Sequence, residues 1–478
     1  MLVIPYLALI ALFALRGECQ CPDYAQFSRE RHEPFSTGRF KLAFQRPNRG
    51  CRTFNSSVVE ERIGEVKDRI ADPDLARLFE NSYPNTLDTA IKWKGFAKGS
   101  DEELTFIITG DINAMWLRDS SNQLQSYLPL LTPSSSTNSL ASLFRGAINL
   151  QARYLIQSPF CNSFQPPVES GIPPETNGAG PNDQVYPAYD RQFVFECKYE
   201  IDSLAAFLQA SVDYYTATKD VDFFGKYQWI KGIESVLKAA ESMMISSYGE
   251  DGSVNPSPYS FRRVWCELTN NGLSAPANNG TGLIRSGFRP SDDPTLYQFF
   301  IPGNMMFSSY LREAAKIMAQ LDEPELTARM KKLSSNLDDA IREHGIVNHP
   351  KFGPIYAFEI DGFGSSNFMD DANIPSLLSA PLSGYLDRTN KVYQNTRKFV
   401  LSRSNPYFMQ GPVISAIGGP HVGLGAAWPM ASIVRILTSD DEDEIIDQLK
   451  QILRSTDGLG LIHESVKANN VKDWTRQW

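Results

Sequence analysis

Apolar residues recur at helical spacing along most of this chain, from about residue 59 onward. Between Leu140 and Pro159 they fall on one face of a helix, which the proline ends. From Asp202 the pattern repeats, and Asp202 is expected at the N-cap or in the first turn. The spacing predicts about eleven helices and few strands. The expected helices lie at about 59 to 80, 119 to 131, 140 to 159, from 202, and at 226 to 247, 303 to 320, 323 to 345, 374 to 385, 388 to 403, 425 to 438 and 440 to 455.

The connections between these segments alternate between short turns and long stretches such as 159 to 200 and 248 to 302. Long loops without their own structure are uncommon in compact domains unless they are functional. Helical hairpins with long loops gathered at one end suggest a toroid. The pattern therefore predicts an all-α fold, a toroid of helical hairpins whose loops form a central pocket, in one catalytic domain over 59 to 478.

Charge and cysteine usage exclude several function classes. The formal net charge of the 478 residues is -9 at pH 7, which argues against nucleic acid as a partner because such binding needs clustered Lys and Arg. The six cysteines and five histidines show neither CxxC nor HExxH spacing. We expect no metal and no cofactor. If the chain is exported, one or two disulfides are expected, with their pairing open.

The N-terminus resembles a secretory leader. An apolar run from Leu2 to Leu15 precedes small and polar residues, and it is short for a bilayer span, with a buried helix as the alternative. Sequons at Asn55 and Asn279 are compatible with export. We expect a signal peptide at 1–18, an N-terminal extension at 19–58, no stable membrane span, and a product that is secreted or held in the secretory pathway, the Golgi and the cell wall included.

The segment Thr109 to Ser120, TGDINAMWLRDS, is rich in groups that bind polyhydroxylated rings. Its carboxylates and asparagine accept hydrogen bonds from hydroxyls, Arg118 offers a rigid fork of donors, and Trp116 can lie against the apolar face of a sugar. The alternative is structural: a Gly-Asp turn, a buried tryptophan and an Arg-Asp ion pair. Residue chemistry alone does not separate the two.

Six further loops share this style, with acids beside an aromatic, a glycine or a histidine. Singly they are weak signals, since an Asp before a helix is usually a cap, paired aspartates can form turns or bind calcium, and His421 can satisfy a loop carbonyl. Together they favour a pocket for sugar binding and acid/base cleavage. The loops are KYEIDS (198–203), GFRPSDD (287–293), YAFEIDGFG (356–364), MDDANIP (369–375), GGPHVG (418–423) and LIHES (461–465).

In their order along the chain, TGDINAMWLRDS, KYEIDSL, FRPSDD, DDANIP and LIHES resemble glycoside hydrolase family 125, the exo-acting α-1,6-mannosidases. The similarity runs from about residue 50 to the end, and the leader resembles that of a fungal secretory-pathway member. The resemblance implies an (α/α)6 barrel. It also implies an inverting mechanism with two carboxylates and no metal, and a mannose-containing glycan or mannoprotein as substrate.

The resemblance implies Asp202 as the general acid and Glu464 as the base that deprotonates the attacking water. The acid needs a raised pKa, from burial or from Glu200, whereas Lys198 would act in the opposite direction. Glu464 is expected to stay ionised beside His463. Substrate-binding positions implied by similarity are Trp116, Arg118 and Asp119 in the terminal mannose subsite, with Asp292, Asp293, Asp370, Asn373 and His421 as further candidates.

The chain ends at WTRQW, where the family usually continues through another helix. The catalytic domain is therefore expected to be cut short, with an incomplete wall beside Glu464. Three alternatives stay open: a non-catalytic mannoside-binding protein, another α/α-toroid glycosidase such as a glucosidase, and a sugar epimerase. The epimerase is less favoured because such enzymes rely on paired histidines.

Overall fold

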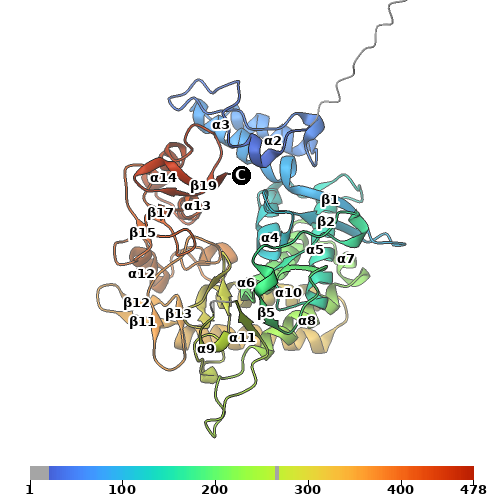
Figure 1. Cartoon of the computed structure of the whole chain (residues 1–478), viewed down its shortest axis with the longest axis vertical. Coiled ribbons are helices and arrows are strands. Elements are labelled where there is room, and N and C mark those ends of the chain that lie inside the picture. Colours follow the sequence, from blue (N-terminus) through green and yellow to red (C-terminus); the bar gives the residue numbers. More distant parts are fainter. Residues whose placement is uncertain (1–20, 264–267, 478) are drawn as a thin grey trace, which may run out of the picture.

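The computed structural model describes residues 21–263 and 268–477 (Figure 1). The expected signal peptide therefore lies outside the described residues. Within them, no helix is long and apolar enough to cross a bilayer. The helices are α1 (Tyr24–Phe27), α2 (Ser57–Lys67), α3 (Pro73–Ser82), α4 (Leu117–Gln125), α5 (Leu140–Gln157), α6 (Ile201–Thr218), α7 (Val221–Lys226), α8 (Trp229–Ser242), α9 (Thr269–Gly272), α10 (Ile301–Met318), α11 (Pro324–His344), α12 (Lys391–Val400), α13 (Pro429–Leu437) and α14 (Glu442–Arg454).

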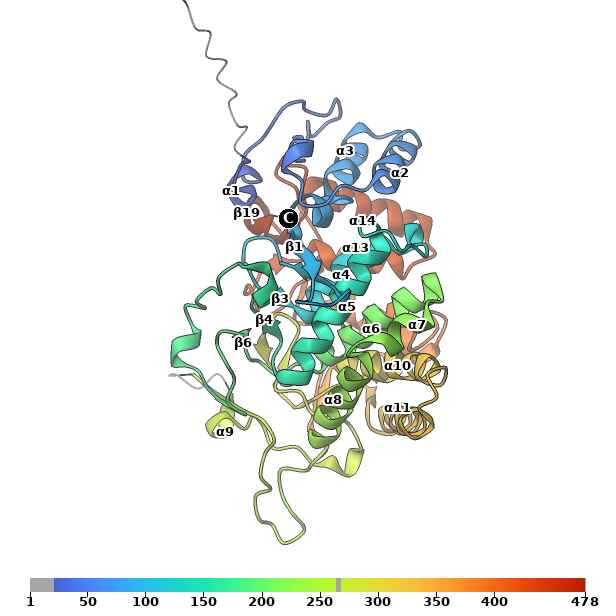
Figure 2. The ribbon, with the colours of Figure 1, turned by 90° about the vertical axis from the view of Figure 1, so that its right-hand side faces the viewer.

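The long helices pair into hairpins that follow one another around a ring, an α/α toroid. Helices α4, α6 and α10 pack side by side, while α5 and α8 pack together behind them and α11 lies along α10. Figure 1 shows the chain passing from α4 through α10 and α12 to α13 and α14, and Figure 2 shows α10 and α11 stacked below α6. The full count of six hairpins stays a prediction.

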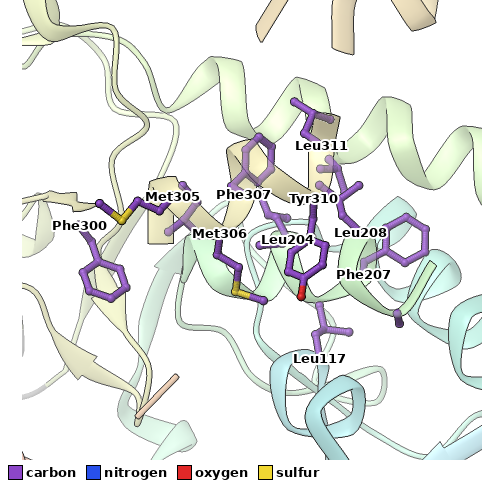
Figure 3. Packing of buried hydrophobic residues seen from close by; sticks show 14 of the residues in the cluster. Leu117, Leu204, Phe207, Leu208, Phe300, Met305, Met306, Phe307, Tyr310 and Leu311 are labelled. Atoms are coloured by element: carbon purple, nitrogen blue, oxygen red, sulfur yellow. The ribbon is translucent and has the colours of Figure 1, made fainter. Parts of the chain in front are cut away.

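Apolar contacts between α6 and its neighbours fix the middle of this ring. Figure 3 shows Phe307 and Leu311 of α10 beside Leu204 and Leu208 of α6, with Leu117 of α4 near the same cluster. All five side chains are fully buried. Burying a side chain of this size contributes about 2 kcal/mol. Helix α6 is therefore held firmly, and with it the residues of its first turn.

The N-terminal extension closes the ring against the last helices. Leu42 and Leu78 form a separate apolar cluster with Ile452 and Leu453 of α14. The disulfide Cys21–Cys51 crosslinks the extension. Hydrogen bonds also join it to the segment after α14, as in Ala43 N to Gly458 O at 3.0 Å. Distant ends of the chain thus meet on one side of the ring.

The toroid of helical hairpins is confirmed, but the chain is not purely helical, because the long connections also contain short antiparallel strands. In the described parts of the chain these form three three-stranded sheets, β3-β4-β6, β10-β13-β14 and β17-β18-β19, and five two-stranded ones, β1-β2, β5-β7, β8-β9, β11-β12 and β15-β16. Buried loops must pair their backbone groups, and ladders of two residues leave no period in the sequence. The bounds are β1 (Ile91–Phe96), β2 (Glu103–Ile107), β3 (Met115–Trp116), β4 (Ser163–Phe164), β5 (Gln184–Tyr186), β6 (Val194–Glu196), β7 (Ser260–Arg262), β8 (Phe288–Arg289), β9 (Asp293–Pro294), β10 (Phe299–Phe300), β11 (Ile346–His349), β12 (Gly353–Tyr356), β13 (Glu359–Ile360), β14 (Ser366–Asn367), β15 (Phe408–Met409), β16 (Ala416–Ile417), β17 (Ala426–Ala427), β18 (His463–Lys467) and β19 (Asn470–Gln477).

Two predicted helices differ from the structure. The segment 374–385 contains only the 3-10 turn Ala380–Ser383, since Pro375 and Pro381 remove backbone donors there. The single helix expected at 59–80 is two helices, because Asp72 caps a new helix whose first residue is Pro73.

Candidate active site

Asp202 lies in the first turn of α6, behind the N-cap residue Glu200. Its side chain is completely buried. Arg118 Nε donates to Asp202 Oδ2 at 3.1 Å, while Oδ1 is buried with no hydrogen-bond partner among the described residues. Burial raises the pKa of Asp202 to about 7, against the opposing charge of Arg118. This carboxyl can keep its proton near neutral pH.

Arg118 joins three of the loops that the sequence singled out. Besides contacting Asp202 from the EIDS segment, Arg118 places its Nη1 3.4 Å from Asn373 Oδ1 of the DDANIP loop. The same nitrogen is 3.3 Å from Asp119 Oδ2. Asn373 is held in turn by Ser291, whose hydroxyl accepts from Asn373 Nδ2 at 2.6 Å. One buried guanidinium thus organises residues far apart in the sequence.

Asp292 occupies a strained turn beside this cluster. Its φ is 62°, a left-handed conformation that non-glycine residues adopt at some cost and often at functional sites. Its Oδ1 accepts from Trp116 Nε1 at 3.2 Å and from Asn162 Nδ2 at 2.6 Å. Lys198 Nζ donates to the Asp292 carbonyl at 2.7 Å. Trp116 is buried, so the structure shows it holding Asp292, and its stacking on a sugar stays a prediction.

Lys198 therefore acts on Asp292. Burial by itself would raise the pKa of Asp292, but Lys198 and Arg118 outweigh it and hold that pKa below its usual value. Glu200, whose carboxyl is buried beside that of Asp292, has a pKa raised well above its ordinary value by burial and by this neighbour. The carboxyls of one cluster thus have opposed protonation preferences.

His421 and Asp293 form a further group of charged residues with Arg289. His421 Nδ1 lies 3.3 Å from Asp293 Oδ1, and this contact raises the pKa of His421. Arg289 contacts both acids, with Nη2 3.6 Å from Asp293 Oδ2 and Nη1 3.3 Å from Asp371 Oδ2. Neither Arg289 nor Asp371 was among the candidates from the sequence.

Asp370 has a structural role within its loop, and its sugar contact stays a prediction. It is completely buried. Its oxygens accept the backbone amides of Leu377 at 2.8 Å and Leu378 at 3.0 Å. Both oxygens are thus engaged within the loop, and Asp370 supports that loop from inside the protein. Its neighbour Asp371 is the aspartate of the pair that faces Arg289.

Glu464 lies on β18, opposite Arg476 of β19. The paired positions on either side are His463 with Gln477 and Ser465 with Thr475. Arg476 Nη1 lies 3.5 Å from Glu464 Oε1. Sequence reasoning missed Arg476, because only the register of the hairpin places it there.

His463 supplies no positive charge beside Glu464 at pH 7. Its ring stacks on Trp474 at 4.3 Å, with Nδ1 3.2 Å from the Arg476 carbonyl. Burial lowers the pKa of His463 to about 4, so the ring is neutral at pH 7. Arg476 is therefore the cation beside Glu464.

The two proposed catalytic carboxyls belong to one electrostatic cluster. The charges of Arg118 and Arg476 both act to lower the pKa of Asp119, and Arg118 contacts Asp202. The charges of Asp293 and Glu464 both act to raise the pKa of His421. Folding has thus brought together the loops that carry Asp202 and Glu464.

Several buried carboxylate oxygens in this cluster have no hydrogen-bond partner among the described residues. Leaving such an atom unpaired costs about 1–3 kcal/mol, which calls for an explanation. A ligand with several hydroxyl groups would satisfy them. The atoms are both oxygens of Glu200, Asp202 Oδ1, and two oxygens that have an ion-pair contact but no hydrogen bond, Asp119 Oδ2 beside Arg118 and Asp293 Oδ2 beside Arg289.

A cavity of about 450 Å³ elsewhere has different chemistry. It lies beside the disulfide Cys161–Cys197 and is lined by Phe160 and Tyr189, without any of the candidate residues. Within 21–263 and 268–477, no group of three or more His, Cys, Asp or Glu side chains is arranged to hold a metal ion. The converging carboxylates and arginines thus mark the candidate site.

Comparisons with known proteins show what this chain is similar to. The family model described as metal-independent alpha-mannosidase (GH125) matches residues 72–478. The "Meiotically up-regulated gene 157 protein" of Schizosaccharomyces pombe is 47% identical over 464 residues, covering 96% of this chain and 89% of the relative. A Streptococcus pneumoniae metal-independent α-mannosidase, solved as a non-productive complex with α-1,6-mannobiose, is 31% identical. Its TM-score is 0.77, with 89% of this chain and 95% of that chain covered.

Proposed function

The chain belongs to the metal-independent α-mannosidases of glycoside hydrolase family 125, and we propose that it is an exo-acting α-1,6-mannosidase that inverts the configuration at the cleaved carbon. The observation that carries the proposal is the pair of contrasting carboxyls. Asp202 is buried with a pKa raised to about 7, whereas Glu464 lies beside the cation Arg476. Inverting cleavage needs one carboxyl that gives a proton and another that takes one.

The reaction proceeds in one displacement. Asp202 donates its proton to the glycosidic oxygen as the bond from that oxygen to C1 of mannose breaks. Glu464 takes a proton from a water molecule, whose oxygen attacks C1 from the opposite face. The products are β-mannose and the shortened glycan, and solvent exchange returns the proton from Glu464 to Asp202. The two carboxyls should be roughly 6.5–9.5 Å apart when substrate is bound.

The terminal mannose is bound by the cluster around Arg118. In this proposal, Arg118, Asp119, Asp292, Asp293, Asn373 and His421 contact its hydroxyl groups, and Trp116 forms part of the wall. The unpaired carboxylate oxygens support this role, because sugar hydroxyls are donors. The α-1,6-mannobiose complex of the S. pneumoniae relative supports the linkage.

We propose that the enzyme acts on mannose-rich glycans or mannoproteins, in the secretory pathway or outside the cell. The apolar leader pattern supports export, as do the sequons and the disulfides Cys21–Cys51 and Cys161–Cys197. The extension at 19–58 and a catalytic domain over 59–478 complete this organisation.

The decisive experiment measures mannose release from α-1,6-mannobiose and from its α-1,2 and α-1,3 isomers, with the product anomer followed by NMR. We expect α-1,6 preference and β-mannose as the first product. Asp202→Asn and Glu464→Gln should each lower kcat by about 10²–10⁴. The matched control is Asp213→Asn, a half-buried aspartate of α6 whose pKa is also raised by burial, and which contacts Gln125 outside the cluster.

Other outcomes identify other functions. Binding of mannobiose by calorimetry without cleavage by wild type would indicate a mannoside-binding protein. Preference for another sugar or linkage would indicate a different toroid glycosidase. First release of α-mannose would contradict inversion.

A further inference from the structure

The ion pair between Glu464 and Arg476 extends to a second acid. Arg476 Nε lies 3.3 Å from Asp111 Oδ2, while Nη1 of the same guanidinium lies 3.5 Å from Glu464 Oε1. Two nitrogens of one planar group thus contact two acids from different segments. A lysine ammonium cannot reproduce that geometry, because it is a single point charge on a flexible stem.

Residues of the N-terminal extension also lie beside Arg476. Tyr24 of α1 and Arg29, which follows α1, line a cavity of about 20 Å³ together with Asp111 and Arg476. Such a cavity holds about one water molecule. The disulfide Cys21–Cys51 crosslinks this segment just before α1. The extension therefore lies beside Arg476 on that side.

Resting on the proposed function, we propose that Arg476 is a positioning residue that holds the carboxylate of Glu464 toward the attacking water, with Asp111 fixing Arg476. Glu464 has three side-chain torsions, and its side chain retains 11% exposure. A cross-strand ion pair selects one of its orientations. A base displaced by about 1 Å can cost about 10²-fold in rate.

The experiment compares Arg476→Ala, Arg476→Lys and Asp111→Asn with wild type on α-1,6-mannobiose. We expect Arg476→Ala to lower kcat by about 10–100-fold while KM changes less than about threefold. Arg476→Lys should recover little, and Asp111→Asn should fall between wild type and Arg476→Ala. Added guanidinium ion at millimolar concentration should partly restore Arg476→Ala but not Glu464→Gln, an effect that a purely structural defect would not show.

Arg329→Ala is the matched control, because Arg329 pairs with Glu241 at the same 41% side-chain exposure as Arg476 but outside the cluster. Crystal structures of wild type and both Arg476 variants give a readout independent of activity. A displaced or multiply oriented Glu464 in Arg476→Ala supports the inference, even if wild type releases no mannose and the proposed function fails. Wild-type kcat together with an unmoved Glu464 would overturn the inference and leave the proposed function standing.

Discussion

Arg118 Nε lies 3.1 Å from Asp202 Oδ2, and the other oxygen of that carboxyl has no hydrogen-bond partner among the described residues. The arginine thus orients the carboxyl while one oxygen remains available to carry a proton. Burial and the arginine act on the pKa of Asp202 in opposite directions, and burial prevails. The proposed acid is therefore both oriented and protonated near neutral pH.

The pH dependence of activity tests this protonation. Because Asp202 has a pKa of about 7, kcat/KM for α-1,6-mannobiose should fall about tenfold per pH unit above that pH. Initial rates between pH 5 and 9 measure the effect, with thermal stability checked at each pH. A profile that stays flat to pH 9 would contradict the assignment of Asp202 as the acid.

The leaving group provides a second test of Asp202. The dinitrophenolate leaving group of a dinitrophenyl α-mannoside departs without protonation. Asp202→Asn should therefore lose far less activity on this substrate than on mannobiose. The two substrates should differ by about 10²-fold or more in the fractional loss. Glu464→Gln should lose activity on both, because water must be deprotonated in either case. Equal losses for Asp202→Asn on both substrates would exclude proton donation to the leaving group.

Arg118→Lys tests whether fork geometry is needed in addition to charge. A single ammonium cannot contact Asp202, Asn373 and Asp119 together, so kcat/KM should fall by about 100-fold or more. Arg263→Lys is the control, since Arg263 pairs with Asp183 away from the cluster. Steady-state kinetics on mannobiose give the answer, and similar small losses in both variants would refute the proposed role.

Glu200 tests the carboxyl pair with Asp292. No donor among the described residues reaches either Glu200 oxygen, so its contact with the Asp292 carboxyl needs a shared proton. Glu200→Gln supplies an amide donor and should keep kcat/KM within about threefold of wild type, whereas Glu200→Ala should lose more than about tenfold. If glutamine is as damaging as alanine, Glu200 does not act as a neutral donor.

Stability should depend on pH through Asp202. Folded Asp202 holds its proton up to about pH 7, whereas an unfolded aspartate loses it near pH 4. Between these values the folded state binds more protons, so this group makes stability fall by up to about 1.4 kcal/mol per pH unit as the pH rises. Urea unfolding from pH 4 to 8 should show a shallower decline for Asp202→Asn. Parallel curves for the two proteins would rule out the raised pKa.

The sequence by itself determined the helical hairpins and the loops that meet at the site. Helical periodicity is local, so α5, α10, α11 and α14 lie within a few residues of their predicted ranges. Acid-rich motifs also identify chemistry directly, because a residue's functional groups do not depend on the fold. The sequence alone therefore identifies the motifs around Arg118 and Asp202.

Only the tertiary structure decided which of these acids face one another. Asp370 and Asp371 are adjacent in sequence, yet the first is bound by backbone amides of its own loop and the second faces Arg289. Arg476 reaches Glu464 through strand register, and His463 turns away to stack on Trp474. Side-chain direction, burial and the resulting pKa values depend on packing between segments hundreds of residues apart. For that physical reason, neighbours in sequence could not reveal them.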